Sequence, residues 1–132
     1  MANSHTDGDA IVFFEQANVV HMGDTFFQGR YPFIDVASGG SIQGMIASSN
    51  LVLSLLKPGT RLIPGHGVIS DATGLTGYRD MLIQAQALVA PLVQRGMSED
   101  EVVAAKPTAA LDVQWGASER FVRNVYQSLK GR

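Results

Sequence analysis

The chain has 132 residues, a net charge of -2 and no cysteine, with 45% hydrophobic and 17% charged residues. This length suits a single domain over residues 1–132, and the balanced charge, without a basic stripe, argues against nucleic acid or an anionic membrane surface as a partner. The lack of cysteine excludes disulfides and thiolate ligands, so a bound metal would need nitrogen and oxygen ligands.

No segment has the features of a leader or of a membrane span. The first ten residues lack a basic stretch followed by an apolar one, and the longest apolar runs are too short to cross a bilayer. We therefore expect a soluble chain without a signal peptide, and of the possible compartments we favour the cytoplasm.

The chain opens with the pattern of a β-hairpin. Residues 10–15 and 19–22 are rich in β-branched and aromatic side chains and flank a short polar turn. Residues 23–40 follow with glycine, proline and aromatic residues but without periodicity, which is typical of an ordered loop.

A helix and a short strand are predicted next. Apolar residues at helical spacing predict a helix over residues 41–56, which Lys57-Pro58-Gly59 ends. Residues 60–63 predict an apolar strand that runs into the turn 64–67, whose glycines allow the backbone to approach another group closely.

The C-terminal part predicts helices. The first spans residues 75–95, and Pro91 should bend or split it. A capping box predicts a short helix over 98–107, an irregular stretch containing Trp115 follows, and a last helix spans 118–129.

These elements predict the α/β (α+β) class, with a mixed sheet that carries helices on one face only. The other face would then be apolar and bare, which soluble monomers rarely tolerate over a large area. We therefore expect a partner to cover it.

Three side chains with metal-binding chemistry are predicted at the ends of strands. His5 precedes the first strand, Asp24 follows the second, and His66 follows the third, each in a turn that contains glycine. Loops at strand ends can aim side chains from a rigid scaffold, and imidazole nitrogen with carboxylate oxygen suits zinc, manganese or iron.

Each of these residues also has a simpler interpretation. A histidine beside glycine is more often a turn residue or a hydrogen-bonded core group than a ligand, and an aspartate after glycine often caps a turn or a helix. We assign His21, on the predicted hairpin strand, to a structural role. The ordered combination of the three motifs is what favours a metal site.

That combination resembles the metallo-β-lactamase superfamily of metallohydrolases. The stretches that carry the resemblance are "HTDGDAIVFF", "HMGDTFFQGRYPFID", "GGSIQGMI" and "TRLIPGHG", and the similarity becomes weaker after Gly67. The resemblance implies that His5 binds one metal, that Asp24 bridges two metals as the central catalytic ligand, and that His66 binds the second. It also implies one or two zinc ions, a metal-held hydroxide that attacks a small-molecule substrate, and a four-layer αββα sandwich.

The chain departs from this family in one respect that matters. The family's His-x-His-x-Asp-His motif is absent, because the only histidines are His5, His21 and His66. We expect the chain to be the C-terminal half of the fold, with the boundary between the halves at the residues "MAN". The sheet would then be completed by a second copy of the chain or by a complementary N-terminal half.

Two questions stay open at the level of sequence. Arg30, Tyr31 and Phe33, in the loop after Asp24, either border a substrate pocket or anchor a packed loop, and the second is the simpler interpretation. The chain is either a half of a metal-dependent hydrolase or a non-catalytic dimerisation module that retains the fold.

Overall fold

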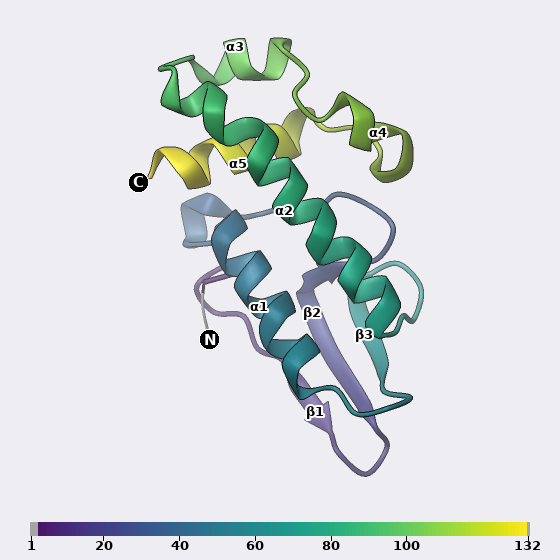
Figure 1. Cartoon of the computed structure of the whole chain (residues 1–132). Helices are drawn as coiled ribbons and strands as arrows, with labels where there is room; N and C mark the ends of the chain where they lie inside the picture. Colours follow the sequence, from purple (N-terminus) through teal and green to yellow (C-terminus); the bar gives the residue numbers. More distant parts are fainter. Residues whose placement is uncertain (1–2, 132) are drawn as a thin grey trace.

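The computed structural model describes residues 3–131, so that residues 1 and 2, within the expected boundary between halves, lie outside the described part. The described chain is an α+β fold that combines a small sheet with helices, the first of which lie between the second and third strands in the sequence (Figure 1). Its strands are β1 (Val12–Phe14), β2 (Val19–Phe27) and β3 (Arg61–His66). Its helices are η1 (Val36–Ser38), α1 (Ile42–Leu55), α2 (Ala72–Gln94), α3 (Glu99–Ala104), α4 (Ala109–Trp115) and α5 (Glu119–Lys130).

Within residues 3–131 the strands form one mixed, three-stranded sheet in the order β1-β2-β3. β1 pairs antiparallel with β2, and β2 pairs parallel with β3. The strand β2 is longer than the predicted 19–22, because its pairing with β3 shifts register around Gly23 (φ 55°) and then continues to Phe27. Asp24 therefore lies inside β2 and not after it, which corrects the prediction, and β3 likewise extends to His66.

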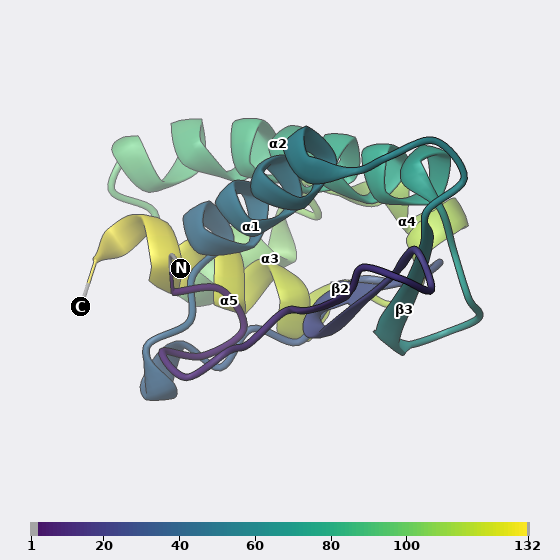
Figure 2. The same cartoon turned by 90° about the horizontal axis from the view of Figure 1, so that it is seen from below.

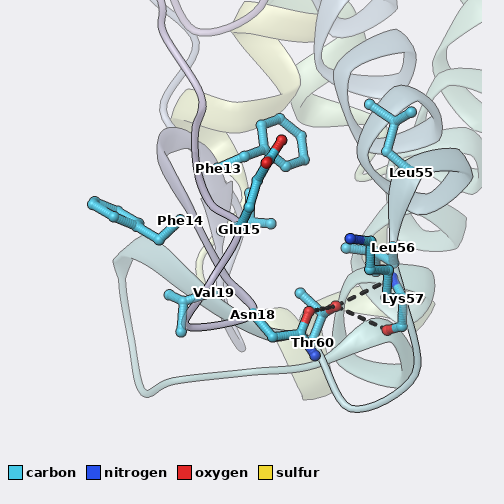
Figure 3. Close-up of a pocket in the computed structure, with 10 residues that line it drawn as sticks. Phe13, Phe14, Glu15, Asn18, Val19, Leu55, Leu56, Lys57 and Thr60 are labelled. Atoms are coloured by element: carbon cyan, nitrogen blue, oxygen red, sulfur yellow. Dashed lines mark hydrogen bonds between the residues drawn. The ribbon is translucent and has the colours of Figure 1, made fainter.

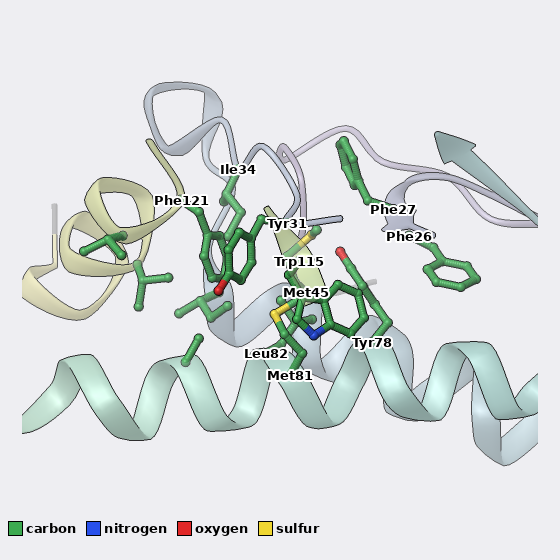
Figure 4. Close-up of a cluster of buried hydrophobic side chains, with 14 of the residues drawn as sticks. Phe26, Phe27, Tyr31, Ile34, Met45, Tyr78, Met81, Leu82, Trp115 and Phe121 are labelled. Carbon is green, nitrogen blue, oxygen red and sulfur yellow. The ribbon is translucent and has the colours of Figure 1, made fainter. Parts of the chain in front are cut away.

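Helices cover one face of the sheet, as predicted. Figure 2 shows α1 and α2 on one side of β2 and β3, while no helix of residues 3–131 lies on the other side. The helix α2 also packs on α5, so a common core joins the sheet to the C-terminal helices. Figure 4 shows this core, in which Phe26 from β2 contacts Tyr78 from α2, with ring centroids 5.1 Å apart.

The helices lie close to their predicted positions, with differences at α2 and α4. The side chain of Ser41 caps α1 and that of Asp71 caps α2, which starts three residues earlier than predicted. Pro91 does not split α2, because the helix continues to Gln94. The stretch around Trp115, predicted to be irregular, is the helix α4, which is held by the packing of Trp115 near Tyr78.

One carboxylate ties α4 to the loop after β2. Asp112 accepts hydrogen bonds from the hydroxyls of Tyr31, Thr108 and Ser118, at 2.6, 3.0 and 2.9 Å. Burial, followed by the bond to Asp112, raises the pKa of Tyr31 well above its ordinary value. Through Asp112, the hydroxyl of Tyr31 fixes the loop after β2 against the C-terminal helices.

The face of the sheet without helices is less apolar than predicted. The strand register places Val12, His21 and Ile63 in one row across it and Phe14, Val19 and Arg61 in the next. Val12 and Phe14 are 47% and 50% exposed, whereas their neighbours include the polar His21 and Arg61. In the described part of the chain, no helix has both the length and the hydropathy that a membrane span requires.

Candidate metal centre

Two histidines approach one carboxylate at the end of the sheet where β2 and β3 finish. Asp24 Oδ2 lies 3.5 Å from His5 Nε2, and Asp24 Oδ1 lies 3.3 Å from His66 Nε2. Each histidine thus faces its own oxygen of the same carboxylate. The side chains of Asp24 and His66 are 40% and 45% exposed and that of His5 is 16% exposed, so the cluster opens to solvent on one side.

The position of Asp24 depends on a close crossing of two backbones. The register shift at Gly23 turns the Asp24 side chain across β3, where Gly65 lies. A Cβ on Gly65 would overlap Asp24 Oδ1 and would lie 2.7 Å from the carbonyl carbon of Gly23. The residue at position 65 must therefore be glycine for the carboxylate to sit between the histidines.

His5 is held by a short N-terminal segment that lies against η1 and the start of α1. The His5 carbonyl accepts a hydrogen bond from the Asp35 amide at 2.9 Å, and the Ser4 carbonyl accepts one from the Ser41 amide at 2.8 Å. Gly44 in α1 leaves room for this segment, because a Cβ there would overlap the backbone of Asn3. These backbone contacts dock the segment against η1 and α1.

The tautomer of His5 follows from a contact 28 residues away in the sequence. Its Nδ1–H donates to the carbonyl of Phe33 at 2.7 Å, since a carbonyl can only accept. In the neutral ring Nε2 then carries a lone pair and no proton, and this lone pair faces Asp24. Two acceptors facing each other at this distance repel unless a cation lies between them or the ring is protonated.

His66 is oriented by stacking. Its ring lies 4.6 Å from that of Phe27, with an angle of 10° between the planes, and its carbonyl accepts from the Gln28 amide. Behind these residues lies Tyr78, whose buried hydroxyl points from α2 towards the Phe26–Phe27 segment in Figure 4. Burial raises the pKa of Tyr78, with Asp24 adding to the effect, so this phenol stays neutral beside the carboxylate.

The cluster has the donor chemistry for zinc but is not a complete cage. Two ligand atoms about 2.0–2.2 Å from one tetrahedral zinc ion lie roughly 3.3–3.6 Å apart, which is close to the separation of each histidine from its oxygen. Yet in residues 3–131 no group of three or more histidine, cysteine or carboxylate side chains has the arrangement to hold a metal ion. The arrangement is two histidine–carboxylate pairs that share Asp24.

The three loop residues proposed to border a substrate pocket have different environments. Phe33 packs edge-on against the ring of His5 at 5.8 Å and so belongs to the cluster. Tyr31 is buried, stacks on Phe121 with ring centroids 4.5 Å apart, and donates a hydrogen bond to Asp112. These contacts agree with the alternative in which Tyr31 anchors a packed loop. Arg30 is exposed in the turn after β2.

His21, assigned to a structural role, lies outside the cluster. It is exposed on β2, and its Nδ1 accepts from the amide of Gly23 at 3.1 Å. Three features of the cluster were not predicted from the sequence: the bond of His5 to the Phe33 carbonyl, the stacking of His66 on Phe27, and the close approach of Gly65 to Asp24. Only the glycines of the turn 64–67 gave a signal, namely that the backbone approaches another group there.

A separate apolar hollow of about 320 Å³ lies at the opposite end of the sheet, between the hairpin and the end of α1. Figure 3 shows Phe13 directed towards Leu55 across this hollow and Phe14 directed away from it. Thr60, Asn18 and Lys57 close its lower end through hydrogen bonds of the Thr60 hydroxyl. The hollow is formed by other residues than the histidine–carboxylate cluster.

The fold and the cluster together define an α+β protein that carries two histidines on one exposed carboxylate at the edge of its sheet. The sequence matches no protein-family model and no curated protein.

Proposed function

We propose that this chain is one half of a metal-dependent hydrolase of the metallo-β-lactamase type and supplies His5, Asp24 and His66 to a zinc site. The observation that carries the proposal is the placement of His5 Nε2 and His66 Nε2 at 3.5 and 3.3 Å from separate oxygens of Asp24. A carboxylate shared in this way is suited to bridge two metal ions, each with its own histidine.

The hydrogen bond of His5 Nδ1, which sets the tautomer of the neutral ring, supports a cation in this place. Because Nδ1–H donates to the Phe33 carbonyl, Nε2 of the neutral ring presents its lone pair to Asp24. A hydrogen bond from the remote ring nitrogen to a carbonyl is the usual support of a metal-bound histidine. With a neutral ring and no metal ion, the lone pair of Nε2 and the Asp24 carboxylate would repel each other.

The chemistry proposed for the complete site is hydrolysis of a small molecule. Zinc would supply a bound water with a lowered pKa at neutral pH. The residues of this chain would hold it in place: Asp24 spans the two histidines, Phe33 fixes the ring of His5, and Phe27 fixes that of His66. The reaction class rests on the resemblance to the family, and the substrate is not specified by these residues.

The remaining ligands would come from outside the chain. Each pair of His and Asp24 offers fewer than the three protein ligands that catalytic zinc usually has. The face of the sheet without helices is the surface that a second copy or a complementary N-terminal half would cover, because Val12 and Phe14 are exposed there. We propose the second copy, which would make the assembly a homodimer.

The metal site is tested by titrating the chain with zinc in a calorimeter. Asp24→Asn and His66→Ala are each expected to weaken zinc binding by more than about a hundredfold, because even residues that only support a ligand contribute 10- to 100-fold. His21→Ala is the matched control, since it removes a histidine outside the cluster. If His66→Ala binds zinc as well as the wild-type chain does, the proposed site is wrong.

The second candidate function is a non-catalytic dimerisation module that retains the fold. It is favoured by the incomplete metal geometry of residues 3–131 together with the exposed side chains of β1. Under this alternative the chain would dimerise without binding zinc. Measurement of mass in solution together with metal content separates the two functions.

The dimer itself makes a prediction that both functions share. Phe14→Glu should raise the dimer dissociation constant at least about tenfold, because a charge buried at an apolar interface costs more than about 1.4 kcal/mol. Val113→Glu, at a position 95% exposed on α4, should leave the constant unchanged. Sedimentation velocity measures both variants, and a wild-type chain that is monomeric at all concentrations would contradict the prediction.

A further inference from the structure

Two arginines one turn apart on α5 have different surroundings. Arg123 forms ion pairs with Glu99, Asp100 and Glu119, at 3.4, 2.8 and 3.3 Å. Arg120 is exposed, and within residues 3–131 it forms no ion pair with a carboxylate. The positive charge of Arg123 is thus compensated inside the chain, whereas that of Arg120 is available to a ligand.

Arg120 is nevertheless held in a defined place. Its guanidinium carbon lies 4.8 Å from the centre of the Phe33 ring, in a cation–π contact. The same ring packs edge-on against His5, and the carbonyl of Phe33 accepts from His5 Nδ1. One aromatic side chain therefore separates the guanidinium from the candidate metal centre.

On the basis of the proposed function, we infer that Arg120 binds an oxyanion group of the substrate, a carboxylate or a phosphate, beside the His5–Asp24–His66 cluster. The planar guanidinium presents paired N–H donors that match two oxygens of either group. In the metal-free chain the exposed carboxylate of Asp24 repels an anion, and the guanidinium of Arg120 supplies a positive charge beside the cluster that can hold one. The Phe33 ring keeps the guanidinium in position, which lowers the entropy lost on binding.

The test uses the metal-free 132-residue chain and NMR. Benzoate and phenyl phosphate are titrated as probes, with benzamide as the uncharged analogue. The anions should give saturable shifts at the Arg120 Nε–H and the Phe33 amide, and benzamide should bind at least tenfold more weakly. A response to one anion only identifies which oxyanion the site prefers.

Variants distinguish this site from other cationic positions. Arg120→Gln should raise the dissociation constant for the anions at least fivefold, and Arg120→Lys should have a smaller effect because it keeps the charge but loses the paired donors. Arg95→Gln, which changes an exposed arginine at the end of α2, should leave the constant unchanged. The amide spectrum of each variant reports that it is folded.

Three outcomes would overturn the inference: equal binding of benzamide and the anions, an unchanged constant in Arg120→Gln, or an equal loss in Arg95→Gln. The proposed function has its own readout, because His66→Ala should abolish zinc binding while leaving the anion titration intact. A chain that binds benzoate through Arg120 but binds no zinc would therefore contradict the hydrolase and retain the oxyanion site.

Discussion

Alanine in place of Gly65 is expected to abolish zinc binding and to lower the free energy of unfolding by about 1–3 kcal/mol, as over-packing of a close contact does. The added methyl group would overlap Asp24 Oδ1 and press on the backbone of Gly23, 2.7 Å away. Either the carboxylate turns away from the two histidines or β2 and β3 separate locally. Urea unfolding followed by circular dichroism gives the stability, and calorimetry gives the zinc affinity.

The two effects of Gly65→Ala can be separated. In Asp24→Asn the side chain keeps its size, so zinc binding should fall while the unfolding midpoint changes much less than in Gly65→Ala. If the Gly65→Ala chain has wild-type stability and wild-type zinc affinity, the absence of a side chain at position 65 is not required for the position of Asp24, and the prediction is wrong.

The second large effect is expected at Gly44, where alanine should release the segment that carries His5. Alanine favours a helix over glycine by about 1 kcal/mol, so the substitution would ordinarily stabilise α1. Here the methyl group would overlap the Asn3 backbone and lie 2.9 Å from the Ser4 amide nitrogen. We expect the contact between Ser4 and Ser41 to be lost, net destabilisation, and zinc affinity reduced at least tenfold.

Gly77→Ala is the matched control for this prediction. Gly77 also lies inside a helix, α2, but a Cβ there would meet no atom within 4 Å. Alanine should therefore stabilise the chain by about 0.5–1 kcal/mol and leave zinc binding unchanged. Stabilisation of equal size by Gly44→Ala, measured by the same urea unfolding, would contradict the proposed docking of His5.

Local patterns were sufficient to predict most elements of this fold. The hairpin follows from β-branched and aromatic residues around a polar turn, and the helices after residues 41 and 118 follow from helical spacing, all of which act between near neighbours. The extension of β2 through Asp24 was not predicted, because Gly23 looked like the end of a strand and is in fact the point where the register shifts. Trp115 was missed because its helix depends on distant packing against Tyr78.

The candidate site was also predicted only in part from the sequence. The sequence indicated that His5, Asp24 and His66 would lie at one rim of the sheet, and the structure places both histidines within 3.5 Å of Asp24. The groups that orient them could not be predicted, since the bond from His5 to the Phe33 carbonyl and the approach of Gly65 to Asp24 join residues far apart in the chain. Whether the three residues bind zinc remains the prediction tested above.

Asp112 and Asp24 differ in how well their surroundings should tolerate substitution during evolution. Asp112 collects three hydroxyls, so a descendant that loses Thr108 or Ser118 still keeps two of them. Each oxygen of Asp24 faces one histidine, so the loss of either histidine leaves one oxygen without this partner. Substitutions among the partners of Asp112 should therefore be tolerated more readily than substitutions among the partners of Asp24.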